Sequence, residues 1–293
     1  MRDTDLLAMK SRRDFLRDTA AAAAGLALAS LGERWGEAAP GSGPSAAAGA
    51  YGPFKMGIQT YSLRGYGFEE ALSRTRELGL RYWEAWDRHL PVTTSTEARE
   101  NARWKLTEAG VTVLAFGVVS FGADRERARR LFEHAKAYRI PTLSADPAPE
   151  AFDYLEGMAR EYEVNIAIHN HGPQSRYDKI ADVENAMKGR DRRIGACVDT
   201  GHFLRSDEDP VEAMRRFGDR LYGVHLKDVT SDKRFTELGK GALKLDAALD
   251  LLRDMRYAHS LSLEYEENPR NPMPGIEESL AAVRASAARI QKS

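Results

Sequence analysis

The feature that most constrains this chain is a regular alternation between short apolar segments rich in β-forming residues and longer amphipathic segments. Between the short segments, apolar residues recur at helical spacing, as Phe68, Leu72 and Leu78 do. Short strands that are apolar throughout are typical of a parallel sheet covered by helices. The predicted strands lie at residues 56–62, 81–86, 111–119, 142–146, 165–171, 194–202, 221–229 and 260–266.

Eight such strand–helix units predict an α/β fold, a single-domain (β/α)8 or TIM barrel. An open, doubly wound sheet is the alternative. It normally carries a GxGxxG turn after its first strand, and the segment IQTYSLRGYGFEE does not have this pattern. Because active sites of barrels lie at the C-terminal ends of the strands, we expect the functional residues there.

The first 50 residues differ from the rest. Arg12 and Arg13 precede Phe15, Leu16 and an Ala/Leu stretch, which resembles a twin-arginine export signal with Arg17 in place of the usual Lys. The stretch is shorter than the roughly 20 apolar residues of a transmembrane helix. We expect a signal peptide and flexible linker at residues 1–50 and the catalytic barrel at residues 51–293. An amphipathic helix at the N-terminus is the alternative.

This signal predicts a periplasmic or other extracytoplasmic protein with no stable membrane insertion after export. Cys197 is the one cysteine, so no disulfide forms within the chain. The net charge of −1 gives no reason to expect nucleic acid as a partner, because nucleic acids select basic surfaces.

The last four predicted strands end in the sequences IHNHG, VDTGH, VHLKD and LEYE. Side chains two apart on a strand share a face, so the ends place pairs of polar side chains together. Each residue alone has a simpler explanation, such as a hydrogen-bonded histidine or an Asp that caps a turn. The pairs are His169 with His171, His225 with Lys227, and Glu264 with Glu266.

The recurrence of such residues on four consecutive strands favours a metal site. Two imidazoles and two carboxylates at similar height suit one divalent ion, such as Mn, Zn, Co, Fe or Mg. Without a cation, burying these groups would carry a large desolvation cost. The predicted ligands are His169, Asp199, His225 and Glu264.

The chain also resembles the xylose isomerase-like barrels, which include sugar phosphate isomerases/epimerases and inosose dehydratase. The resemblance rests on DTGH (199–202), VHLKDV (224–229), LGKGALKL (238–245) and LSLEYE (261–266). It implies one divalent ion on the same four positions. The epimerases of this family have Glu on the fifth strand where this chain has His169, which leaves Glu264 as the one carboxylate base among the four ligands.

Together with the export signal, the resemblance implies an exported sugar isomerase/epimerase-family enzyme that removes the proton beside the carbonyl of a keto-sugar and forms a metal-stabilised enolate. A lyase or dehydratase that eliminates from a 3-keto-glycoside or keto-cyclitol is the close alternative. Glu264, His202 and Lys227 are the candidate catalytic residues. The candidate substrate contacts are His171, His89, Glu266 and Gln59.

Two further hypotheses are weaker. A non-catalytic sugar-binding barrel would need no tightly bound metal ion. An endonuclease IV-like phosphodiesterase would need a three-zinc cluster and a basic face, and the sequence has neither pattern. A small carbohydrate is the expected partner, and a homo-oligomer stays open.

Overall fold

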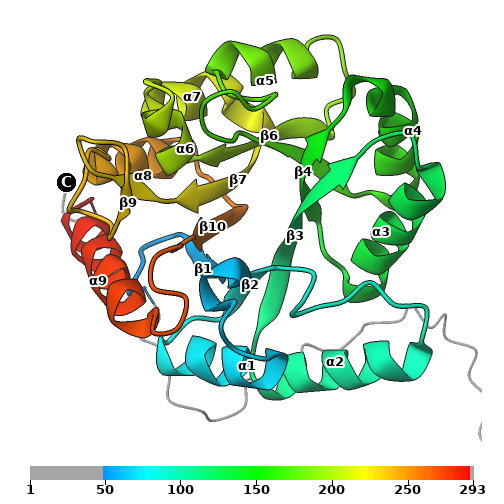
Figure 1. The fold of residues 1–293 in the computed structure, drawn as a ribbon, viewed down its shortest axis with the longest axis horizontal. Coiled ribbons are helices and arrows are strands. Elements are labelled where there is room, and N and C mark those ends of the chain that lie inside the picture. Colours follow the sequence, from blue (N-terminus) through cyan, green and yellow to red (C-terminus); the bar gives the residue numbers. More distant parts are fainter. Residues whose placement is uncertain (1–48, 291–293) are drawn as a thin grey trace, which may run out of the picture. The chain divides into compact units, whose positions relative to one another are not determined.

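The computed structural model describes residues 49–290. Eight parallel strands close into a barrel in the order β1-β10-β7-β6-β5-β4-β3-β2, as Figure 1 shows. The predicted (β/α)8 barrel is therefore confirmed. The expected signal peptide at residues 1–50 falls almost entirely outside the described residues and stays a prediction. The barrel strands are β1 (Lys55–Gln59), β2 (Tyr82–Ala85), β3 (Thr112–Phe121), β4 (Thr142–Pro147), β5 (Asn165–His169), β6 (Ile194–Asp199), β7 (Leu221–Leu226) and β10 (Ser260–Leu263).

Helices surround the barrel (Figure 1). Several begin at a polar cap, such as Ser95, whose hydroxyl accepts a hydrogen bond from the Ala98 N–H, and Asp124, which accepts one from the Arg127 N–H. Within residues 49–290, no helix is both long and apolar enough to cross a membrane. The helices are α1 (Phe68–Glu77), α2 (Thr96–Glu108), α3 (Arg125–Tyr138), α4 (Phe152–Tyr162), α5 (Ile180–Met187), α6 (Thr200–Arg205), α7 (Pro210–Phe217), α8 (Leu245–Asp254) and α9 (Met273–Ile290).

The sixth strand ends earlier than its sequence suggested. The expected strand covered residues 194–202, but β6 stops at Asp199 and helix α6 begins at Thr200. The Asp199 side chain accepts a hydrogen bond from the His202 N–H at 2.7 Å and so caps the helix. Asp199 therefore combines two positions, the last residue of a strand and the N-cap of a helix. This places His202 in the first turn of α6.

A buried carboxylate organises the loop that follows β7. Asp228 begins the short strand β8 (Asp228–Val229), which pairs with β9 (Phe235–Thr236). Its side chain accepts four backbone N–H groups at 2.8–3.1 Å, those of Val229, Gly239, Gly241 and Leu243. A Cβ at Gly241 would lie 2.3 Å from the Asp228 Oδ1 atom, so glycine is required for this close approach.

Asp228→Asn should lower the free energy of unfolding by about 3 kcal/mol, because one carboxylate oxygen becomes an NH2 group that faces N–H donors. Asp232→Asn is the matched control in the same loop, since the Asp232 side chain is 58% exposed and pairs with Arg234. We expect little change there. Urea unfolding of both variants measures the difference, and equal midpoints would contradict the role of Asp228.

Candidate metal centre

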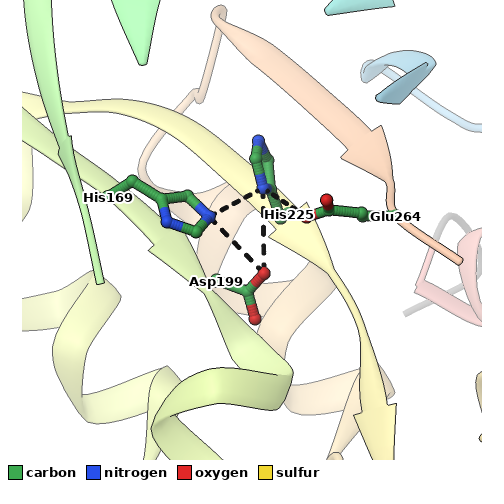
Figure 2. Close-up of side chains that lie close together, drawn as sticks. All are labelled: His169, Asp199, His225 and Glu264. Atoms are coloured by element: carbon green, nitrogen blue, oxygen red, sulfur yellow. Dashed lines mark hydrogen bonds and ion pairs between the residues drawn. The ribbon is translucent and has the colours of Figure 1, made fainter. Parts of the chain in front are cut away.

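Four side chains converge at the C-terminal ends of four neighbouring strands. His169 ends β5, Asp199 ends β6, His225 lies near the end of β7, and Glu264 directly follows β10. The strand pairs β5–β6, β6–β7 and β7–β10 are in parallel register, which brings these ends together. One ligand atom from each residue lies within 4.8 Å of the others. Figure 2 shows the four side chains pointing toward one another.

The shortest approaches within this cluster are made by His225. Its Nδ1 atom lies 3.0 Å from the Nε2 atom of His169 and 2.9 Å from the Oε2 atom of Glu264. The Oδ2 atom of Asp199 lies 3.6 Å from His169 Nε2 and 3.7 Å from His225 Nδ1. All four residues are buried, and Glu264, at 8% exposed, is the most accessible.

The donor set fits a divalent metal ion. Asp199 Oδ2 and Glu264 Oε2 are buried and have no hydrogen-bond partner within residues 49–290. They face ring nitrogens of two histidines, so four atoms with lone pairs point at one another. Mixed imidazole and carboxylate ligands of this kind suit a divalent ion. A cation among these atoms would compensate for their burial.

Lys227 supplies part of the compensating charge. Its Nζ atom lies 3.1 Å from Asp199 Oδ2, 3.1 Å from Glu264 Oε2 and 2.6 Å from Glu266 Oε1. Burial works against charge on Asp199 and Glu264, but the ammonium group of Lys227, together with neighbouring histidines, outweighs it and lowers the pKa of both carboxylates. The same carboxylates raise the pKa of Lys227 against the effect of its burial. The lysine is therefore charged at neutral pH.

Two further histidines line the cluster. The rings of His169 and His171 are 4.6 Å apart, and those of His171 and His202 are 5.4 Å apart. Burial lowers the pKa of His171 to about 3 and that of His202 to about 4. Both imidazoles are therefore neutral at pH 7. The Phe235 ring lies 5.5 Å from His202, and Lys227 Nζ lies 4.8 Å from its centroid.

The other two candidate contacts make different interactions. The Gln59 side chain donates a hydrogen bond to the Gly117 carbonyl and accepts one from the Tyr61 N–H. His89 is 3% exposed, and its Nε2 atom lies 3.0 Å from the Tyr66 carbonyl oxygen. The structure thus brings His171, His202, Lys227 and Glu266 to the four-residue cluster, whereas Gln59 and His89 contact backbone groups of other segments.

The sequence reasoning missed two buried polar residues at the site. Asn170 accepts a hydrogen bond from the Asp199 N–H at 2.8 Å and donates one to the Asp199 carbonyl at 3.0 Å, which ties β5 to β6. Glu84 of β2 is wholly buried, with its Oε2 atom 2.8 Å from His225 Nε2. A charged residue inside the apolar segment RYWEAW was the one available signal for Glu84.

Comparison with known proteins gives the same fold. A family model described as xylose isomerase-like TIM barrel matches residues 144–286. Inosose dehydratases from Clostridium perfringens and Halalkalibacterium halodurans are 24% identical over 149 residues and 27% identical over 147 residues. These matches cover 42% and 43% of this chain and 48% and 47% of the relatives. The chain thus spans about half the length of the curated relatives it matches.

Solved structures match more of the chain. An uncharacterized protein from Parabacteroides distasonis is 30% identical, with a TM-score of 0.64, over 78% of this chain and 97% of that chain. The IolI protein with a bound zinc atom is 16% identical, with a TM-score of 0.63. The match covers 81% of this chain and 95% of IolI. The 3-keto-D-glucoside 4-epimerase YcjR from E. coli is 17% identical, with a TM-score of 0.64. The match covers 79% of this chain and 99% of YcjR. At these identities, IolI and YcjR show a shared fold. Residues 144–286 are therefore similar to the xylose isomerase-like TIM barrels.

Proposed function

We propose that this protein is a divalent-metal-dependent enzyme that removes the proton beside the carbonyl group of a keto-sugar. The observation that carries this proposal is the position of Glu264. Its buried carboxylate lies within a four-residue donor cluster and beside the ammonium group of Lys227. The similarity to inosose dehydratases supports chemistry on a sugar-like substrate.

The protein would hold the ion through His169, Asp199, His225 and Glu264. A divalent ion held there would polarise a carbonyl group and lower the cost of forming an enolate. The structure of IolI with zinc supports a metal in a barrel of this fold. The Oε2 atom of Glu264 faces His225 and Lys227, which leaves Oε1 to accept the proton from the substrate carbon.

Three other groups stabilise the oxygen that becomes negative. Lys227 is charged and brings an ammonium group to the cluster. His171 and His202 are neutral, so each has one ring N–H to donate to a substrate oxygen. Glu266 holds Lys227 through a 2.6 Å hydrogen bond and is a candidate contact for a sugar hydroxyl.

The asymmetry of the site favours elimination over epimerisation. Epimerisation by two bases needs a second base on the opposite face of the substrate. Glu264 and Glu266 both follow β10, whereas His169 ends β5 and His171 has a pKa of about 3. In an elimination, Glu264 takes the proton, the C–O bond at the next carbon breaks, and the proton passes from Glu264 to the departing oxygen, which accepts a hydrogen bond from the ring N–H of His202. This reaction makes the protein a lyase or dehydratase for a 3-keto-glycoside or a keto-cyclitol.

An isomerase or epimerase is the second candidate. It shares the proton abstraction by Glu264 and differs in where the proton returns. The fold that the chain shares with YcjR, a 3-keto-D-glucoside 4-epimerase, favours this outcome. Export by the twin-arginine route belongs to the same proposal and rests on Arg12 and Arg13 in the sequence.

Glu264→Gln should reduce kcat on a keto-sugar substrate by about 10²- to 10⁴-fold, because the amide cannot accept the proton. Metal content, measured in parallel by mass spectrometry, separates loss of the base from loss of the ion. Glu277→Gln, on the exposed face of α9, is the matched control and should keep full activity. Retention of most turnover in Glu264→Gln would reject this residue as the base.

The products formed in D2O distinguish the two outcomes. Incubation of the metal-loaded protein with a 3-keto-glucoside should release the free alcohol and an unsaturated keto-sugar, detected by NMR. Deuterium exchange beside the carbonyl, with stereoisomers as the sole products, would overturn elimination and support epimerisation.

A further inference from the structure

The carboxylate of Glu84 lies against the ring of His225. Glu84 is wholly buried, and its Oε2 atom is 2.8 Å from the Nε2 atom of His225. Neither of its oxygen atoms has a hydrogen-bond partner within residues 49–290, so the ion-pair contact with His225 is its closest polar approach there. An isolated buried carboxylate is costly, so its one close contact must compensate for its burial.

Glu84 reaches His225 across the barrel. Strand β2 pairs with β1 and β3, whereas His225 lies on β7, which pairs with β6 and β10. The contact is therefore not a consequence of strand pairing. It is made on the ring nitrogen opposite the cluster, and Figure 2 shows this nitrogen of His225 pointing away from His169, Asp199 and Glu264.

A divalent ion bound at the Nδ1 atom of His225 leaves the hydrogen of the neutral ring on Nε2, and Nε2 faces Glu84, whose carboxylate can accept that hydrogen. In a neutral imidazole the lone pair then lies on Nδ1, the atom that is 3.0 Å from His169 Nε2 and 2.9 Å from Glu264 Oε2. We infer that Glu84 is a positioning residue that selects the Nε2–H form of His225 and directs its Nδ1 lone pair to the divalent ion. This inference rests on the proposed metal site.

The negative charge of Glu84 has a second effect. A carboxylate behind a ligating histidine fixes its ring and makes its free nitrogen a stronger ligand, and loss of such a partner typically weakens metal binding about 10- to 100-fold. A Gln side chain at the same position has nearly the same volume but no charge. It can also turn its NH2 group toward Nε2, which would favour the wrong form of the ring.

The test compares Glu84→Gln with Ser144→Ala. Ser144 is also wholly buried on a barrel strand, and its hydroxyl has no hydrogen-bond partner among the described residues. The Kd for Zn2+, measured by competition with a chromophoric chelator, should rise about 10- to 100-fold in Glu84→Gln. It should stay at the wild-type value in Ser144→Ala.

A second measurement separates positioning from a general structural role. Long-range 1H–15N NMR of the zinc-loaded protein should show His225 with hydrogen on Nε2 in the wild type and in Ser144→Ala. In Glu84→Gln this form should lose its dominance while the circular dichroism spectrum stays unchanged. Equal Kd values in all three proteins would overturn the role of Glu84 alone. Failure of the wild type to bind Zn2+ would overturn the metal site and this inference with it.

Discussion

The structure of the site depends on one electrostatic constraint, the burial of several lone-pair atoms at one point. His169, Asp199, His225 and Glu264 bring ring nitrogens and carboxylate oxygens within 4.8 Å of one another, away from water. Like partial charges repel, and burial strengthens that repulsion because the local dielectric constant is low. Lys227 relieves part of it through its contacts with Asp199 and Glu264. A divalent cation would relieve the remainder, which makes metal binding the simplest account of the arrangement.

The barrel maintains this arrangement because the four strand ends cannot separate without breaking the closed sheet. The register of β5, β6, β7 and β10 sets the height of each ligand. Asn170 then ties the ends of β5 and β6, and Asp228 fixes the loop beyond β7. Fixed positions of these four side chains are required to align a substrate carbonyl with a base. The chemistry thus follows from the positions of the strand ends more than from any single residue.

The sequence predicted the barrel and the four converging residues because both depend on local pattern. Alternating strands and helices define the fold, and the C-terminal ends of the strands define one shared face. The contact between Glu84 and His225 was not predictable in this way, because it joins strands that are not neighbours in the sheet. The end of β6 was misjudged because Asp199 also caps a helix. Gln59 and His89 have the right residue types near the early strands, but their side chains bind backbone atoms.

The most direct test of the central claim is anomalous diffraction from crystals of the purified protein grown with Zn2+ and measured at the zinc absorption edge. The account predicts one strong peak about 2.0–2.2 Å from a nitrogen of His169, a nitrogen of His225 and an oxygen of each of Asp199 and Glu264. A map with no peak among these four side chains, or with a peak bound by other residues, would contradict it.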